Sequence, residues 1–111
     1  MYDELLTGLP LELPLEASYA RHVWYNYVVQ IEESRRDDFL RHLTQHGVPA
    51  FVMYPTLVPL QPAYRDDLGY SESDFPVGAP LTRRIVNLPI FAHMTDEEVR
   101  QVATTVKTYF K

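Results

Sequence analysis

The chain has 111 residues, of which 46% are hydrophobic and 23% charged, and its formal net charge is −5 at pH 7. This length suits a single domain with a small core, and an acidic chain without a Lys/Arg cluster argues against nucleic acid or anionic membranes as partners. The lack of cysteine excludes disulfides and thiolate chemistry and disfavours structural zinc. We see neither a secretory leader nor an apolar run of ~20 residues, so we expect a cytoplasmic protein without a membrane span.

The N-terminal segment predicts the end of a helix followed by a connector. Residues 2–9 carry apolar side chains at helical spacing, and Gly8 and Pro10 end that pattern. The next residues repeat Pro, Leu and Glu, which is typical of an extended connector. We therefore treat the chain as one domain with three parts: the end of a helix (1–9), a connector (10–21) and the domain body (22–110).

A strand is predicted over His22–Ile31, because every second residue from Val23 onward is apolar. The opposite face is mixed and includes Asn26. Trp24, Tyr25 and Tyr27 offer two interpretations, a platform for stacking a sugar or base and ordinary core packing. Core packing is the more frequent use of such a cluster.

A helix should follow this strand. Ser34 and Asp37 resemble a capping box, Phe39–Leu43 supplies a buried stripe, and Gly47 is suited to end the helix. A short strand is then expected at Ala50–Tyr54.

The segment Met53–Tyr64 is apolar and contains Pro55, Pro59 and Pro62. Proline lacks a backbone N–H and fixes φ, so neither a helix nor a sheet ladder can continue through the segment. Two interpretations remain open at this point: a rigid crossover that covers the edge of the core, and the wall of a binding site.

The remaining chain predicts a helical turn at Ala63–Leu68, a helix near Pro80, a strand at Ile85–Leu88 and a closing helix. Thr95 and Glu98 form a capping box for that closing helix. The order of elements predicts a small α/β (α+β) fold, in which helices pack on a mainly antiparallel sheet of about three strands.

The residues alone predict no catalytic or metal site. His42 and His46 are four apart on a predicted helix, but neither lies in an HExxH motif and a third ligand would have to come from elsewhere. Solvent-exposed histidines are therefore preferred to a metal site. Adjacent acidic residues, such as Asp66 and Asp67, point apart and do not make an acid–base couple.

Five motifs together resemble the C-terminal domain of the DegT-type (DegT/DnrJ/StrS) aminotransferases, and the resemblance extends from Tyr2 to Phe110. The motifs are Tyr54-Pro55, Gln61-Pro62-Ala63-Tyr64, Phe75-Pro76-Val77, Leu88-Pro89 and Thr95-Asp96-Glu97-Glu98. The family uses pyridoxal phosphate (PLP) to aminate keto sugars attached to nucleotides. The resemblance implies the small-domain fold of fold-type I PLP aminotransferases, a homodimer, a nucleotide-sugar substrate, and an N-terminal PLP-binding domain as partner.

PLP chemistry needs a lysine that forms a Schiff base with the cofactor. The only lysines here are Lys107 and Lys111, at the end of the last predicted helix, where the helix dipole accounts for them. We therefore expect this chain to bind no cofactor and not to transaminate alone.

In the family, the segment that matches Met53–Tyr64 borders the active-site cleft. Many members have histidine where Met53 and Pro59 stand here, so the resemblance does not carry substrate contact to these two positions. Tyr54, Gln61 and Asn26 remain as the candidate substrate-binding residues. The alternative is a free-standing, non-catalytic module that binds a small molecule or a partner.

Overall fold

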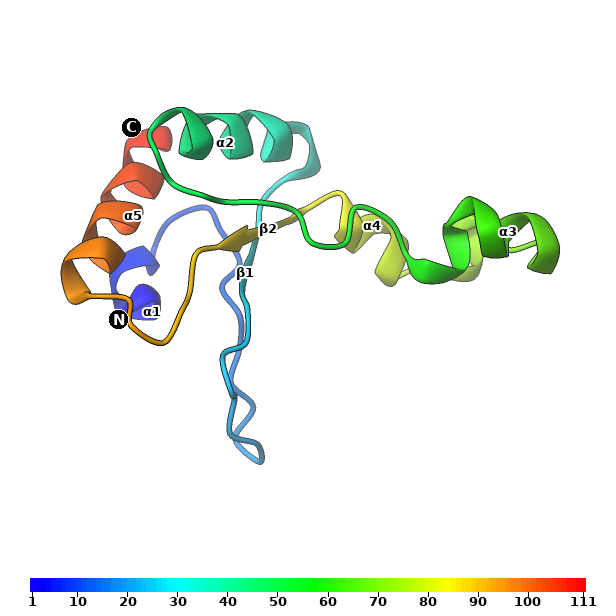
Figure 1. The fold of residues 1–111 in the computed structure, drawn as a ribbon, viewed down its shortest axis with the longest axis horizontal. Helices are drawn as coiled ribbons and strands as arrows, with labels where there is room; N and C mark the ends of the chain where they lie inside the picture. The colour runs from blue at the N-terminus through cyan, green and yellow to red at the C-terminus, as the bar shows by residue number, and fades with distance from the viewer.

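Two short antiparallel strands lie at the centre of the computed structural model, which describes all residues 1–111 (Figure 1). β1 (Tyr27–Gln30) pairs with β2 (Ile85–Leu88) so that Val28 faces Asn87. Three helices, α1 (Tyr2–Leu6), α2 (Glu33–Gln45) and α5 (Asp96–Tyr109), pack around this pair. The helices α3 (Pro62–Leu68) and α4 (Gly78–Thr82) lie in a segment that projects from it. In chain order the elements are α1, β1, α2, η1 (Val58–Leu60), α3, η2 (Glu72–Asp74), α4, β2 and α5, where η1 and η2 are 3-10 turns.

The hydrophobic core lies where the strands meet α1, α2 and α5. Its fully buried side chains come from each of these elements and include Leu6, Val29, Phe39, Val86 and Val106. Burying each such side chain contributes about 1.5–3 kcal/mol. The predicted α+β class is therefore confirmed, with five helices and a sheet of two strands.

Two of the helix ends expected from local sequence signals are formed, and one is not. The Thr95–Glu98 capping box is formed, with the Thr95 Oγ1 accepting the Glu98 N–H at 3.3 Å and the Glu98 carboxylate accepting the Thr95 N–H at 2.7 Å. Gly47 has φ +77°, a left-handed conformation that ends α2 as predicted. The expected capping box at Ser34 is wrong, because α2 already begins at Glu33 with Glu32 as its N-cap.

The first predicted strand is too long. β1 contains only Tyr27–Gln30, and the preceding residues form an irregular segment. Trp24 has φ +52°, which no strand residue adopts. As a result Val23 and Tyr25, which the predicted alternation placed on the apolar face of the strand, are 87% and 78% exposed.

The third predicted strand is absent, so the sheet has two strands rather than about three. Ala50–Tyr54 makes only an isolated bridge, in which Phe51 pairs with Asn87. The pairing does not extend beyond this bridge, and further along the chain Pro55 lacks the N–H that a resumed ladder would require.

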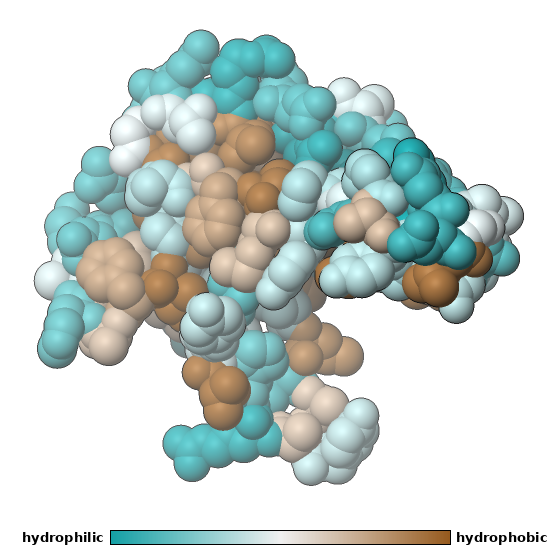
Figure 2. Space-filling model, turned by 45° about the vertical axis from the view of Figure 1, so that its right-hand side comes forward, coloured by the Kyte–Doolittle hydropathy of each residue, from teal (hydrophilic) through white to brown (hydrophobic).

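Two protrusions give the molecule its shape. We call residues 14–25 the loop and residues 52–82 the arm. Both extend away from the packed body in Figure 1, and both remain distinct when side chains are filled in (Figure 2). The radius of gyration is 15.6 Å, against about 13 Å for a compact domain of 100 residues. No helix has both the length and the apolar character needed to cross a bilayer.

Candidate functional site

The base of the arm is joined to the sheet by hydrogen bonds. The Asn87 N–H donates to the Phe51 carbonyl at 2.8 Å, and the Phe51 N–H donates to the Asn87 carbonyl at 3.2 Å. Two residues further on, the Met53 N–H donates to the Asn87 side-chain Oδ1 at 3.2 Å. The prolines begin directly after this point, so the arm continues through η1 and α3 without a partner strand.

The three predicted substrate-binding residues lie at two places on the arm and its base. Asn26 is half-buried, and its Nδ2 donates to the Met53 sulfur at 3.6 Å. Tyr54 follows Met53 and is 59% exposed. Gln61 is exposed and lies between η1 and α3, as the N-cap of α3 without a side-chain capping bond. Asn26 and Tyr54 therefore lie on either side of Met53, at the base of the arm, while Gln61 stands at the start of α3, which Figure 1 shows farther out along the arm.

A second set of contacts holds the returning part of the arm. Arg36 of α2 donates to the Thr82 carbonyl at 3.3 Å. The Arg83 guanidinium contacts both Glu33 and Glu72 at 2.9 Å, and the hydrogen bond to Glu33 is the main reason why the pKa of Arg83 is raised. These contacts tie α2 to both ends of the segment that carries α4.

Exposed apolar side chains are unusually frequent on the arm. Every residue of α3 is exposed. The arm as a whole carries six exposed large hydrophobic residues: Tyr54, Val58, Tyr64, Leu68, Tyr70 and Val77. Single exposed apolar residues need no explanation, but a concentration of them on a projecting segment is typical of a surface that contacts something else.

The aromatic residues near the first strand are divided between core and surface. The rings of His22, Trp24, Tyr27 and Tyr2 form a continuous stack, with centroid separations of 4.1, 5.7 and 4.8 Å. Tyr25 instead points to solvent. For Tyr27, and in part for Trp24, core packing is therefore the correct interpretation.

Two buried tyrosine hydroxyls lie beside a groove of about 450 Å³ between α1, the loop and the segment before α5. The Tyr2 hydroxyl donates to the Pro89 carbonyl at 2.9 Å, and the Tyr27 hydroxyl donates to the Asp3 carboxylate. Burial raises the pKa of both hydroxyls, and for Tyr27 the bond to Asp3 raises it further.

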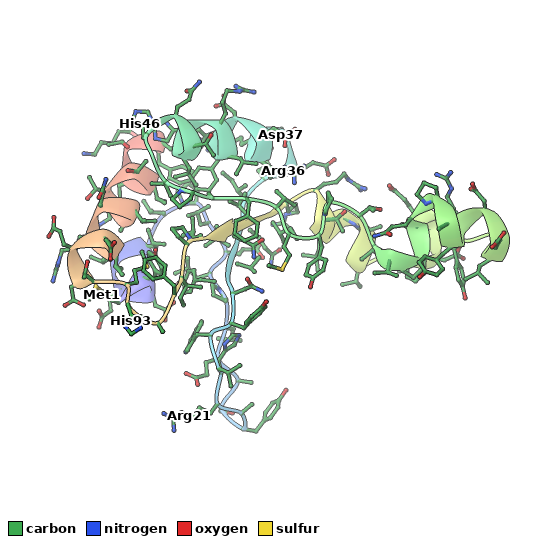
Figure 3. All side chains as sticks on the ribbon, viewed as in Figure 1. Met1, Arg21, Arg36, Asp37, His46 and His93 are labelled. Carbon is green, nitrogen blue, oxygen red and sulfur yellow. The ribbon has the colours of Figure 1, made fainter.

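The two helical histidines have contacts within the fold. The His42 ring lies with Nε2 3.0 Å from the Thr105 carbonyl, so it links α2 to α5. The His46 Nδ1 lies 2.8 Å from the His42 carbonyl, at the end of α2 seen in Figure 3. No group of three or more potential ligands (His, Cys, Asp or Glu) is placed to hold a metal ion.

The two lysines of this chain, the residue type that PLP chemistry requires, both lie at its C-terminal end. Lys107 lies in the last turn of α5 and Lys111 follows it; the C-terminal end of α5 lies on the side of the body away from the arm (Figure 1). The candidate residues Asn26, Tyr54 and Gln61 therefore have no lysine beside them.

Asn87 and Arg83 are the two residues of this region that sequence reasoning missed. The signal for Asn87 was present, since one amide interrupts the apolar run Ile85–Leu88. An amide in a buried strand needs a hydrogen-bond partner, but the sequence did not say which one. Arg83 carried no such signal, because nothing in the sequence shows that the fold brings Glu33 and Glu72 to its guanidinium.

Comparison with known proteins places this geometry in a family. The profile of the DegT/DnrJ/EryC1/StrS aminotransferase family matches residues 1–107. The erythromycin biosynthesis sensory transduction protein EryC1 of Saccharopolyspora erythraea is 37% identical over 96% of this chain and 28% of its own length. The dTDP-3-amino-3,4,6-trideoxy-alpha-D-glucose transaminase of Streptomyces venezuelae is 31% identical over 94% of this chain and 27% of its own length.

Solved structures agree with these relatives. The crystal structure of S. venezuelae DesV in complex with a ketimine intermediate superposes with a TM-score of 0.91 at 31% identity, over 99% of this chain and 29% of that one. The chain thus spans a little over a quarter of the length of the proteins that it matches. By sequence and by fold, this chain belongs to the DegT/DnrJ/EryC1/StrS aminotransferase family.

Proposed function

We propose that this chain is the C-terminal domain of a PLP-dependent enzyme that transfers an amino group to a nucleotide-linked keto sugar. Residues 22–110 are the domain body, 10–21 the connector and 1–9 the end of the helix that joins it to the N-terminal domain. Support comes from the match over residues 1–107 combined with the small share of each relative that is covered. Relatives named as dTDP-amino-sugar transaminases support the substrate class.

In this proposal the arm is one wall of the substrate cleft. The Tyr54 hydroxyl and the Asn26 and Gln61 amides supply polar contacts to the sugar nucleotide. Tyr54 is suited to this role because its side chain is largely exposed at a point where Met53 is held from two sides. Gln61 has an amide free of any capping bond. Pockets that bind small molecules commonly combine apolar walls with a few placed polar groups.

The N-terminal domain of the same enzyme and a second subunit would cover the loop and the outer face of the arm. The observation that carries this proposal is the exposure of large apolar side chains on both protrusions, at Leu15 and Tyr19 as well as along the arm. Surfaces of this kind are buried between domains or subunits. The full enzyme would be a cytoplasmic homodimer.

The isolated chain should not hold PLP, since the Schiff-base lysine, the acid that pairs the pyridine nitrogen and the phosphate site would lie in the N-terminal domain. The test is to mix the purified chain with PLP, record the aldimine absorbance band and reduce with borohydride. We expect no stoichiometric aldimine band, and only the weak, substoichiometric labelling that borohydride gives on the exposed amines of any protein mixed with PLP. A covalent adduct on Lys107 or Lys111 together with amino transfer would refute the proposal.

Tyr54 is tested in the complete enzyme. Tyr54→Phe removes one hydroxyl, so we expect the KM for the nucleotide sugar to rise by about threefold to tenfold while the PLP absorbance is unchanged. Tyr19→Phe on the loop is the matched control, and its KM should equal that of the wild type. A Tyr54→Phe enzyme with unaltered kinetics would remove Tyr54 from the site.

A free-standing binding module is the alternative, and the exposed apolar arm is compatible with it as well. The reading frame upstream of Met1 separates the two. A contiguous lysine-bearing PLP domain supports the aminotransferase, whereas a stop codon and a promoter support the separate module.

A further inference from the structure

Asn87 is a buried amide in the middle of a strand that is otherwise apolar. Only 2% of Asn87 is exposed, and its neighbours Val86 and Leu88 belong to the core. Burying an amide in this way costs free energy unless it is hydrogen-bonded. The backbone N–H and C=O of Asn87 already pair with Phe51, so the side chain must serve a different partner.

That partner is the backbone of Met53, whose N–H donates to the Asn87 Oδ1 at 3.2 Å. Were the antiparallel ladder to continue beyond the Phe51–Asn87 bridge, Met53 would lie opposite Ile85 and pair with its backbone. The side-chain oxygen of Asn87 takes the N–H of Met53 instead. The chain therefore leaves the sheet at Met53 rather than extending as a third strand.

Met53 is also held from the other side, because the Asn26 Nδ2 donates to its sulfur at 3.6 Å. The Asn87 amide thus holds the backbone of Met53, and the Asn26 amide holds its side chain. Tyr54 is the next residue along the chain, so its position depends directly on where Met53 is held.

We propose that Asn87 is a positioning residue, whose side-chain amide fixes the point and direction at which the arm leaves the sheet and so sets Tyr54 in the substrate cleft. The second half of this inference rests on the proposed function, whereas the first concerns the fold of this chain alone. Asn87 itself need not touch the substrate.

The anchoring is tested by amide hydrogen exchange in the 111-residue chain. Asn87→Ala removes the acceptor and keeps the backbone bridge, so the Met53 amide should exchange about tenfold faster relative to the amides of β1. Asn87→Asp keeps an acceptor oxygen but buries a carboxyl group, which lowers the overall stability; the protection of Met53 relative to the amides of β1 should nevertheless be restored. Equal relative exchange in wild type and Asn87→Ala would overturn the anchoring.

Val86→Ala is the matched control for lost stability. It opens a cavity one residue away, next to the same bridge, and lowers the overall stability. The amides of β1 should then exchange faster while the local protection of Met53 is kept. If Val86→Ala and Asn87→Ala change the ratio of Met53 to β1 exchange equally, the effect is general destabilisation and the proposal fails.

The effect on substrate is tested in the complete enzyme. Asn87→Ala should raise the KM for the nucleotide sugar by about tenfold with an unaltered PLP absorbance, and Asn87→Asp should recover most of that loss. An active wild type with an unchanged KM in Asn87→Ala would overturn the positioning role. If the wild-type enzyme aminated no nucleotide sugar, both the proposed function and the role of Asn87 in placing Tyr54 in the cleft would be refuted. The exchange experiment would still decide whether Asn87 anchors the arm.

Discussion

The Tyr27 hydroxyl is held at the boundary of the core by the Asp3 carboxylate of α1. The side chain itself is buried and stacks against Tyr2. Both features favour the protonated phenol, which is why the pKa of Tyr27 is raised above its usual value of 10.0. This contact helps to hold the N-terminal helix on the sheet, and its effect should be visible in the pH dependence of stability.

The sign of that dependence follows from the raised pKa. Above pH 10 the tyrosines of the unfolded chain ionise while Tyr2 and Tyr27 stay protonated in the fold. The free energy of unfolding therefore falls as the pH rises through this range, by up to about 1.4 kcal/mol per pH unit for each group. Below pH 10 this contribution is fully present.

Tyr27→Phe should consequently have two effects in urea unfolding. At neutral pH it loses the bond to Asp3, which lowers the free energy of unfolding by about 1 kcal/mol. Above pH 10 the free energy of unfolding of Tyr27→Phe should fall less steeply with pH than that of the wild type, because the variant lacks one ionisable hydroxyl. Tyr19→Phe, at an exposed position of the loop, should match the wild type at every pH. Parallel declines for Tyr27→Phe and the wild type would contradict the assignment.

Trp24 explains why the first strand was predicted too long. The alternation of apolar and other residues from Val23 to Ile31 is the usual signature of a half-buried strand. The left-handed backbone at Trp24, whose N–H donates to the His22 Nδ1 at 2.8 Å, interrupts the extended chain, so β1 starts only at Tyr27. This local bond could not be foreseen from periodicity. Val23 and Tyr25 are apolar without being core, so their alternation misled the prediction.

At the scale of elements, the start of α5 is determined by a capping box in its own sequence. Thr95 and Glu98 exchange hydrogen bonds across the first turn, and the Thr95 backbone N–H is the main reason why the pKa of Glu98 is lowered. A lowered carboxyl pKa contributes stability that is present above the unfolded-state pKa and is lost as the pH falls through the folded-state pKa. The capping box should therefore weaken in acid.

Thr95→Ala should lower the free energy of unfolding by about 1 kcal/mol at neutral pH. Thr104→Ala is the matched control, because Thr104 is exposed within the same helix, where alanine is the better helix former. It should leave stability unchanged or slightly higher. The gap between the two variants should narrow in acid as Glu98 is protonated, and a gap that stays constant down to low pH would argue against the capping box.

Elements bounded by a formed cap, a proline or a glycine were predicted well, whereas β1 was cut short by a local turn at Trp24 and the segment Ala50–Tyr54 depends on a distant partner. A capping box starts α5, a glycine ends α3, and a proline follows β2. Ala50–Tyr54 looked like a strand, but whether it pairs depends on Asn87, which lies more than thirty residues away. For the same reason, Tyr54, Gln61 and Asn26 were chosen by family resemblance, and the residue that anchors their segment emerged only in the fold.

At the scale of the whole molecule, the packed body and the two protrusions have different characters. The body buries its side chains from α1, α2, α5 and both strands. The loop is ordered by its own hydrogen bonds, such as that from the His22 N–H to the Glu16 carboxylate at 2.9 Å, yet it presents apolar side chains to solvent. An ordered segment that exposes apolar surface is suited to contact another protein surface.

This shape predicts that the isolated chain associates with itself. Apolar side chains that would face a neighbouring domain or subunit are accessible around Trp24 and around Leu57–Leu60, where Val23, Tyr25 and Val58 are exposed. Burying them between copies is favourable by about 25 cal/mol per Å². Sedimentation velocity at rising micromolar concentration should therefore give an increasing average mass.

Replacing exposed apolar residues of the loop should weaken this association without unfolding the chain. Val23→Ser with Tyr25→Ser removes two largely exposed side chains and leaves the core intact, so the melting temperature should be unchanged while the average mass falls towards that of the monomer. Leu43→Ser, which introduces a hydroxyl at a fully buried core position, is the opposite case and should lower the melting temperature. A wild-type chain that remains a monodisperse monomer throughout the concentration series would mean that these protrusions are stable in solvent as they are, and the argument that they normally face another part of the enzyme would lose its main physical support.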